Sequence, residues 1–326
     1  MSTTDVELMH HAIGAAAAVR ASTAPNPWVG AAVLTPDGEV HTGATSPPGG
    51  PHAEVNAIAA AGDVRGAVLA TTLEPCNHTG RTGPCAEAII EAGIRRVLVG
   101  IQDPDEQVAG CGIQRLRDAG IDVEVGVCAD EITAQLAPYL HHRRTGRPYV
   151  LVKIAMTADG RTAAPDLSSQ WITDEPARTD SHTLRAESQA ILVGAGTIRA
   201  DDPSLTTRFV EGPSPQRVVL GSAPVGAKVH PCLEWRGELG DLLDHLGGEG
   251  VLQLMVEGGS STIAQFYAEG LIDQFAIYVA PAMFGGDDGH PVFVGSGAPT
   301  MADLRRGRFV GVRQVGRDVR LDIVLD

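Results

Sequence analysis

Short apolar runs alternate with amphipathic stretches through the first part of the chain. The runs are rich in Val, Ile, Leu and Ala and are bounded by Gly, Pro or Asp, as buried strands are. Stretches with helical spacing lie between them, and Thr4 and Glu7 form a capping-box pattern at the start of the first one. Strands that alternate with helices predict an α/β domain of three layers. The predicted strands are residues 29–34, 39–42, 67–72, 96–101 and 121–125. The predicted helices are residues 4–20, 52–60, 86–92, 112–119 and 130–142.

A second series begins after residues 143–148, a basic stretch with Gly and Pro that we interpret as a domain boundary. The length of 326 residues fits two domains, which we place at residues 1–146 and 147–326. Residues 309–325 alternate apolar and polar positions and predict an antiparallel hairpin around residues 316–318. The other predicted strands are residues 149–156, 190–193, 217–220, 251–256 and 274–279. The predicted helices are residues 174–186 and 261–269.

Composition narrows the class of protein. The sequence has no run of about 18 apolar residues, which predicts no membrane span, and its N-terminus lacks a basic-then-apolar signal. The formal net charge of −15 argues against nucleic acid as a partner, because binding a phosphate backbone needs a basic face. Five scattered cysteines predict a reducing cytoplasm and metal-bound thiols rather than a disulfide framework.

The strongest chemical signal is one histidine with two cysteines and a nearby carboxylate. His52, Cys76 and Cys85 supply three ligands of the kind that zinc prefers, which leaves the fourth position for a water of lowered pKa. Glu54 is then free to move protons, as in zinc nucleobase deaminases with the signature H-x-E…P-C-x-x-C. Here the second cysteine follows nine residues after the first, so that signature is only half met.

Two other interpretations of these residues stay open. A structural zinc site would use His78 as a fourth ligand, and it would have no need of Glu54. Alternatively, His52 and the two thiols are ordinary buried side chains with no metal. The catalytic interpretation gains from local structure, because His52 and Glu54 fall in the first turn of a predicted helix, where free N–H groups favour an anion.

Two glycine-bearing stretches in the second half suggest another site. Residues 193–197 and 256–262 each leave a predicted strand and carry hydroxyl side chains, which makes a natural phosphate cradle. Neither is G-x-G-x-x-G, and each could be no more than a strand-end turn. With Arg185 and Arg208 nearby in sequence, they favour a phosphate-bearing ligand. No second nucleophile or metal set accompanies them, which favours a bound cofactor that carries the chemistry.

These residues together resemble the family of bifunctional riboflavin-biosynthesis enzymes, diaminohydroxyphosphoribosylaminopyrimidine deaminase and 5-amino-6-(5-phosphoribosylamino)uracil reductase. In that family the longer gap between the two cysteines is normal. The first half carries the resemblance at Asn26-Pro27, residues 51–55, residues 73–85 and Gln102-Asp103-Pro104. The second half carries it at residues 153–161, 169–173, 184–186 and 193–208.

The resemblance implies a cytidine-deaminase-like domain at residues 1–146 and a dihydrofolate-reductase-like domain at residues 147–326. The first would deaminate 2,5-diamino-6-ribosylamino-pyrimidinone 5′-phosphate with zinc, and the second would reduce the ribosyl group to a ribityl chain with NADPH. The zinc ligands would be His52, Cys76 and Cys85, with Glu54 as the catalytic proton shuttle. Asn26 would hold the base and Arg81 would meet the ribose phosphate.

In the second domain the resemblance implies two sets of residues. The NADPH-binding positions would be Ala155, Trp171, Thr197, Asp201, Ser222, Gly259, Ser260, Ser261 and Thr262. The substrate-binding positions would be Ser169, Arg185, Leu205, Arg208 and Glu257. The alternatives are a surface charge for each arginine and a core aromatic for Trp171. We also expect a homo-oligomer, either a dimer or a tetramer.

Three positions depart from the family pattern. Thr45, Asp105 and Cys111 stand where the family often has a histidine, an Asn-Pro pair and a basic residue, respectively. All three are expected at the substrate rim of the first domain, where Asp105 would repel a phosphate. They motivate two alternatives: a zinc deaminase of another base or nucleoside with a non-catalytic second domain, and a non-catalytic nucleotide sensor.

Overall fold

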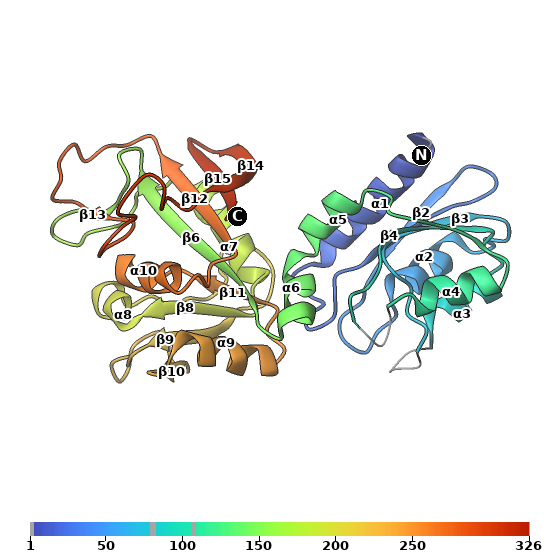
Figure 1. The fold of residues 1–326 in the computed structure, drawn as a ribbon, viewed down its shortest axis with the longest axis horizontal. Coiled ribbons are helices and arrows are strands. Elements are labelled where there is room, and N and C mark those ends of the chain that lie inside the picture. The colour runs from blue at the N-terminus through green and yellow to red at the C-terminus, as the bar shows by residue number, and fades with distance from the viewer. Residues whose placement is uncertain (1–2, 79–82, 106–108, 326) are drawn as a thin grey trace. The chain divides into compact units, whose positions relative to one another are not determined.

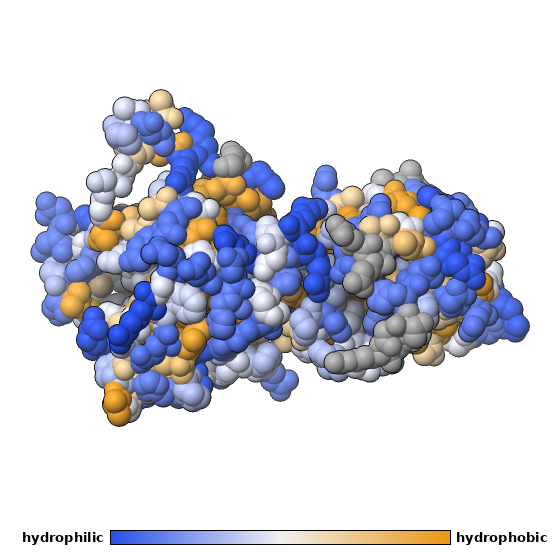
Figure 2. Space-filling view, turned by 60° about the horizontal axis from the view of Figure 1, so that its bottom comes forward, coloured by the Kyte–Doolittle hydropathy of each residue, from blue (hydrophilic) through white to orange (hydrophobic). Residues whose placement is uncertain are grey.

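The computed structural model of the chain describes residues 3–78, 83–105 and 109–325. It divides into two compact units, Met1–Gly146 and Arg147–Asp326, each with its own core (Figure 1). Polar side chains cover most of the face of each unit seen in Figure 2, with apolar patches scattered among them. Within the described residues, no helix is both long and apolar enough to cross a membrane.

The first unit is built on a five-stranded sheet of order β2-β1-β3-β4-β5. Strand β1 runs antiparallel to β2 and β3, whereas β3, β4 and β5 are parallel. The strands are β1 Gly30–Leu34, β2 Val40–Ala44, β3 Val68–Leu73, β4 Arg96–Ile101 and β5 Asp122–Val125. The helices are α1 Thr3–Val19, α2 Ala53–Ala61, α3 Cys85–Glu91, α4 Cys111–Asp118, α5 Ala129–Gln135 and α6 Ala137–Thr145.

Helices cover both faces of this sheet, which confirms the predicted three-layer α/β domain (Figure 1). Two glycines allow the closest approaches. A Cβ on Gly30 would lie 1.9 Å from the Ala12 carbonyl oxygen of α1, and one on Gly43 would lie 2.2 Å from the Ala57 amide nitrogen of α2. Helix α2 therefore lies directly on the strands, which fixes the position of Glu54 in its first turn. His52 is the residue immediately before the helix, and not in its first turn as the sequence predicted.

Two details of the prediction were wrong in this unit. The single helix expected at residues 130–142 is two helices, α5 and α6, which meet at Leu136. Pro138 lies in the first turn of α6, and a proline has no N–H to continue a helix through that position. Helix α1 begins at Thr3, so Thr4 lies within the helix instead of capping it.

The second unit has an eight-stranded sheet of order β10-β9-β8-β11-β6-β12-β15-β14 and a small sheet of β13 and β7. Neighbouring strands from β10 to β12 are parallel, and the last two are added antiparallel as the predicted hairpin. The strands are β6 Tyr149–Thr157, β7 Arg161–Ala163, β8 Ala190–Gly194, β9 Gln216–Leu220, β10 Leu233–Trp235, β11 Gln253–Val256, β12 Gln274–Ala280, β13 His290–Pro291, β14 Gly307–Val315 and β15 Asp318–Leu325. The helices are α7 Glu175–Ala186, α8 Ala195–Asp201, α9 Leu239–Gly248 and α10 Ser260–Ala268.

Alternate residues of these strands pack against helices on opposite faces of the large sheet. Val150 and Val152 share a core with Leu242 of α9 and Phe266 of α10, whereas Leu151 packs with α7. Helix α9 was missed by the sequence prediction, although Leu239, Leu242, Leu243 and Leu246 have the spacing of a buried helix face. Strands β7, β10 and β13 and helix α8 were also missed, and each has seven residues or fewer.

One buried carboxylate ties the parallel strands of the first unit to α4. Glu74 follows β3 and is only 4% exposed. Its Oε1 accepts hydrogen bonds from the amides of Gly112 and Ile113 at 3.0 and 3.1 Å. Its Oε2 accepts from the amides of Gly110 and Asp103 at 2.9 and 3.4 Å. Because Glu74 lies two residues before Cys76, this carboxylate also fixes the segment that carries that thiol.

We expect Glu74→Gln to lower the free energy of unfolding by about 2 to 3 kcal/mol, because a neutral amide cannot accept from all four N–H donors. Urea denaturation followed by circular dichroism measures this difference. The control is Glu91→Gln, an exposed position on α3, for which a change within about 0.5 kcal/mol is expected. Equal stabilities of the two variants would contradict the anchoring role of Glu74.

Candidate functional site

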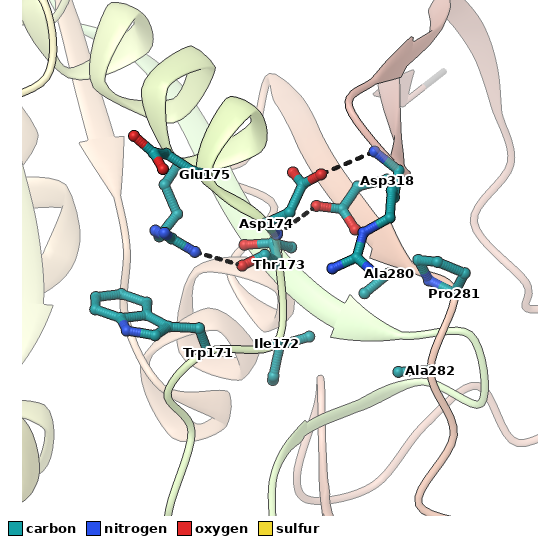
Figure 3. A pocket seen from close by; sticks show the side chains of 11 residues that line it. Trp171, Ile172, Thr173, Asp174, Glu175, Ala280, Pro281, Ala282 and Asp318 are labelled. Carbon is teal, nitrogen blue, oxygen red and sulfur yellow. Dashed lines mark hydrogen bonds between the residues drawn. The ribbon is translucent and has the colours of Figure 1, made fainter.

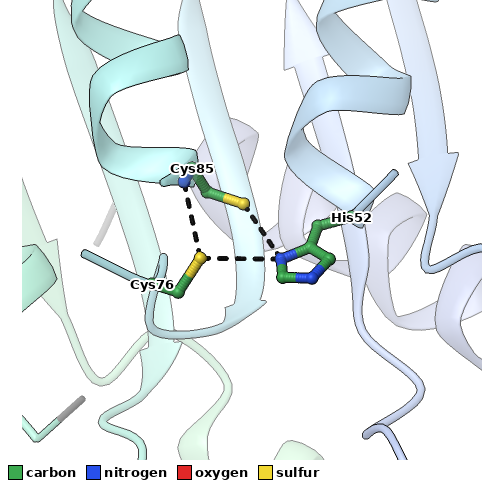
Figure 4. Close-up of side chains that lie close together, drawn as sticks. All are labelled: His52, Cys76 and Cys85. Carbon is green, nitrogen blue, oxygen red and sulfur yellow. Dashed lines mark hydrogen bonds between the residues drawn. The ribbon is translucent and has the colours of Figure 1, made fainter. Parts of the chain in front are cut away.

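His52, Cys76 and Cys85 converge at one point of the first unit (Figure 4). His52 is the residue immediately before α2, Cys76 follows β3, and Cys85 is the first residue of α3. His52 Nδ1 lies 3.2 Å from Cys85 Sγ and 3.6 Å from Cys76 Sγ, and the Cys85 amide donates to Cys76 Sγ at 3.4 Å. All three candidate ligand atoms lie within 4.8 Å of one another.

This arrangement fits zinc. Bonds of about 2.1 Å to nitrogen and 2.3 Å to sulfur in a tetrahedral site separate the ligand atoms by roughly 3.5 Å. The observed distances of 3.2 and 3.6 Å bracket that value. His78 is exposed and lies outside this cluster of described residues, which leaves the interpretation as a four-ligand structural site without support.

The two thiols differ in their electrostatics. The hydrogen bond from Cys85, assisted by His52, lowers the pKa of Cys76 to about 4, whereas the same hydrogen bond and burial raise the pKa of Cys85. The Cys85 thiol therefore keeps its proton and donates it in a hydrogen bond to the Cys76 thiolate. A cation placed between the two sulfurs would take over this role and release the proton, as metal binding to thiols does.

Glu54 supplies an acid–base group next to this cluster. It is the second residue of α2 and is 3% exposed. Burial raises the pKa of Glu54 to about 7. A carboxyl group with a pKa near neutrality can both accept and return a proton, which is the property that general acid–base catalysis requires.

A cavity of about 500 Å³ opens beside the cluster and admits a ligand of nucleotide size. Asn26, Thr45, Glu54 and Asp105 all line it. Arg81 lies outside the described residues. Cys111 is exposed at the start of α4 and is not among the described residues that line the cavity, so its expected place on the rim was wrong.

Arg143, which the sequence did not single out, also lines the cavity, with its Nε 3.9 Å from Asp105 Oδ2. This cation offsets the repulsion expected from Asp105.

In the second unit the two glycine-bearing turns lie side by side, at the ends of the adjacent parallel strands β8 and β11. A Cβ on Gly194 would lie 2.6 Å from Thr262 Oγ1, and one on Gly259 would lie 3.7 Å from Thr197 Oγ1. The turns therefore form one surface of backbone amides and hydroxyls at the starts of α8 and α10. Such a surface suits a phosphate group.

A buried group of charges lies next to these turns. Arg185 Nη2 is 2.8 Å from Glu257 Oε1, and Arg185 Nη1 donates to the Thr206 carbonyl oxygen at 2.8 Å. Burial lowers the pKa of Lys153, and Glu257 opposes that change. Burial opposes ionisation of Glu257, but Arg185 and Lys153 together lower its pKa. The excess of positive charge suits an anionic or electron-rich ligand.

Lys153 and His182 were not among the predicted site residues. Lys153 could have been found, because it is a lone cation in the otherwise apolar run at residues 149–156. His182 lies on α7 and accepts a hydrogen bond at Nδ1 from the Arg208 amide at 3.0 Å. No feature of the local sequence points to that contact, which joins residues 26 positions apart.

Trp171 is an exposed aromatic side chain of the second unit. It is 64% exposed, so it is not a core aromatic, and the Arg178 guanidinium lies 4.6 Å from its ring. Among the described residues, Trp171 is the only predicted reductase position that lines the cavity of about 440 Å³ between the start of α7 and residues 280–282 (Figure 3).

The remaining predicted positions have ordinary local contacts. Ser222 accepts a hydrogen bond from Arg236, and Ser260 donates to the Pro291 carbonyl oxygen. Leu205 is buried with a φ of 53°, and Arg208 is exposed and donates to Ser204. Ala155 on β6 pairs with Tyr278 on β12, and Asp201 is the last residue of α8. Ser169 lies two residues before Trp171 in an irregular segment. Ser261 is exposed in the first turn of α10.

Comparison with known proteins gives matches over both units. A family model described as the cytidine and deoxycytidylate deaminase zinc-binding region matches residues 2–101. One described as the RibD C-terminal domain matches residues 148–321. The chain is 37% identical to the riboflavin biosynthesis protein RibD of Bacillus amyloliquefaciens, covering 97% of this chain and 95% of the relative. It is 40% identical to RibD of Mycobacterium tuberculosis strain H37Rv, with coverages of 98% and 96%.

A solved structure from Thermotoga maritima is similar over the same extent. It is a diaminohydroxyphosphoribosylaminopyrimidine deaminase/5-amino-6-(5-phosphoribosylamino)uracil reductase with a TM-score of 0.89 and 30% identity. The similarity covers 99% of this chain and 99% of that chain.

The buried imidazole of His182 generates a prediction about stability and pH. Burial, together with Arg185, lowers the pKa of His182 from 6.5 to about 4. Between these values the unfolded chain binds more protons than the folded one, so stability rises with pH and is lost as the pH falls from 6.5 towards 4. The loss reaches about 3 kcal/mol at most.

We expect urea denaturation at several pH values to show this loss in the wild-type protein and not in His182→Gln. The comparison is made as a difference between the two proteins, because other groups titrate equally in both. Parallel dependences on pH would contradict a neutral, buried His182.

Proposed function

The chain belongs to the RibD family of bifunctional riboflavin-biosynthesis enzymes, and from this premise we propose how its residues carry out the two reactions. It is a zinc-dependent deaminase and an NADPH-dependent reductase that acts on a small molecule. The first unit is cytidine-deaminase-like and the second is dihydrofolate-reductase-like. The observation that carries the proposal is the convergence of His52, Cys76 and Cys85 beside the buried Glu54.

In the first unit, His52, Cys76 and Cys85 would hold zinc, which when bound supplies a Lewis acid. Glu54 takes a proton from the water that attacks the amine-bearing ring carbon, and returns it to the departing ammonia. Its burial and its pKa near 7 support both transfers. Asn26, on the cavity wall, orients the base through its amide. The proposed phosphate contact of Arg81 rests on the family resemblance alone, whereas Arg143 is a cation on the cavity wall.

In the second unit, the paired glycine turns hold a cofactor phosphate through Thr197, Gly259, Ser260, Ser261 and Thr262, while NADPH when bound supplies a hydride. Ala155, Trp171, Asp201 and Ser222 are proposed as further cofactor contacts, and Ser169, Leu205 and Arg208 as substrate contacts.

Three charged side chains of the second unit, of which Arg185 is buried and Lys153 and Glu257 are partly buried, act on the substrate in this proposal. Arg185, oriented by Glu257, holds an anionic or carbonyl group of the substrate, and Lys153 provides positive charge where negative charge develops. A merely scaffolding second domain would not need this group of charges beside a phosphate cradle, because withdrawing charges from water is costly.

The proposal also covers the cellular compartment and the oligomeric state of the protein. The five free thiols support a reducing cytoplasm as the place of action. A homo-oligomer, either a dimer or a tetramer, is proposed as the working form, and size-exclusion chromatography with light scattering would measure it directly.

We expect Glu54→Gln to lower ammonia release from the diaminopyrimidine ribotide by roughly 10²- to 10⁴-fold, which is the usual cost of losing a positioned acid–base group. Zinc content and the oxidation of NADPH with the deaminated substrate should stay at wild-type values. The matched control is Glu39→Gln, an exposed residue before β2. Unchanged ammonia release in Glu54→Gln, with zinc retained, would sink the proposed role.

The reductase half yields the complementary prediction. Lys153→Met keeps the length of the side chain but removes its charge, so NADPH oxidation should fall by about 10²-fold while ammonia release is preserved. Lys228→Met, at an exposed lysine paired with Asp202, serves as the control. If Lys153→Met oxidised NADPH at the wild-type rate, the buried cation would have no part in hydride transfer.

A further inference from the structure

A second set of metal-ligand atoms lies on the opposite side of the first unit's sheet from α2. His10 on α1 and Cys128 and Glu131 at the start of α5 bring an imidazole, a thiol and a carboxylate together. His10 Nε2 lies 3.2 Å from Glu131 Oε2 and 4.0 Å from Cys128 Sγ. All three candidate ligand atoms are within 4.8 Å of one another.

Buried contacts fix the backbone from which these side chains extend. On α1, Met9 and Ala12 are fully buried, and on the α5 side Ile132 and Leu136 are fully buried. The Gln135 side chain donates from Nε2 to the Ile13 carbonyl oxygen at 2.9 Å, which joins the two helices directly. The relative position of the helices is therefore determined by the core and not by the exposed side chains.

Local sequence places both of the other ligands at the start of α5. Cys128 is the residue immediately before the helix and Glu131 is the third residue of its first turn, so the two side chains project from the same end of α5. Cys128 has a left-handed backbone, with φ of 56° and ψ of 33°, at the point where the chain turns into α5. This conformation is uncommon for a residue with a side chain, and Cys128 Sγ lies 4.0 Å from His10 Nε2.

We propose that His10, Cys128 and Glu131 bind a divalent transition-metal ion of the zinc or cobalt type. Imidazole, thiolate and carboxylate are the three ligand types that zinc accepts, at bond lengths that separate ligand atoms by roughly 3.3 to 3.6 Å. The nitrogen-to-oxygen distance of 3.2 Å is already close to this range, and the nitrogen-to-sulfur distance of 4.0 Å needs a rotation of the Cys128 side chain. Water fills the fourth position.

The role assigned to this site is structural. Its three residues do not line the cavity beside Glu54. Its ligands come from two helices that pack on the same face of the sheet, so a bound ion cross-links α1 to α5. The inference is independent of the proposed reactions, because the chemistry at His52, Cys76 and Cys85 does not involve these residues.

The test uses the full-length protein loaded with one equivalent of zinc and then freed of excess metal. Titration with Co²⁺ is followed through the thiolate-to-cobalt charge-transfer absorbance, and bound zinc is measured before and after, so that exchange at the His52 site is counted separately. We expect a further equivalent of cobalt to bind with a thiolate band in the wild-type protein.

The variants identify the ligands. Cys128→Ser should lose that band, and His10→Gln and Glu131→Gln should each weaken cobalt binding roughly tenfold or more. Cys111→Ser, an exposed thiol at the start of another helix, should bind like the wild type. A second equivalent of zinc, added to protein whose His52 site is already loaded, should raise the thermal midpoint of the wild-type protein but not that of Cys128→Ser. A wild-type protein that binds no further cobalt, or a Cys128→Ser variant that keeps the band with its zinc undisturbed, would overturn the proposal.

Discussion

The carboxylate of Glu74 is the interaction on which the arrangement of the first unit depends. Of its four hydrogen bonds from backbone amides, three join the end of β3 to the start of α4 and one joins it to Asp103 after β4, and together they hold the segment that runs on to Cys76. A buried charge is tolerated only where donors surround it, so the loop is defined by the need to satisfy this group. His52 is positioned next to Cys76 by a different contact, because Gly43 allows α2, which follows His52, to approach the sheet closely.

In the second unit the central charged groups are cations, whereas in the first unit the central group is the Glu74 carboxylate. Arg185 is buried and Lys153 is partly buried near Glu257, and the carboxylate orients the arginine through Nε and Nη2 together. Two cationic side chains lie beside one carboxylate in this group, which suits the anionic or electron-rich ligand proposed for it. The adjacent glycine turns contribute amides without side chains, which would let the proposed cofactor phosphate approach the backbone closely. The positive charge thus comes from Arg185 on α7 and Lys153 on β6, whereas close approach to the backbone is provided by the glycine turns at the ends of β8 and β11.

The sequence predicted most elements with long periodic patterns, and strand β4 agrees with its predicted bounds at residues 96–101. The prediction missed α9, whose pattern of leucines was present, and joined α5 to α6 across Pro138. The convergence of His52, Cys76 and Cys85 could be anticipated from their ligand types together with the family resemblance, in which the nine-residue gap between the cysteines is normal. The contact of Arg143 with the cavity and that of His182 with Arg208 could not, since both arise from tertiary packing between distant segments.

The two ligand clusters of the first unit differ in how their surroundings constrain them. Around His52 the thiols are partly or fully buried, a buried acid adjoins them and a cavity gives access, an arrangement that suits the proposed binding and proton transfer in one enclosed place. Around His10 the imidazole and the carboxylate are about half exposed, and solvent competes for every bond. Ligand atoms alone therefore do not make a catalytic centre. Desolvation of the neighbouring carboxyl group raises its pKa to the range in which it can exchange a proton, and only the first cluster has that neighbour.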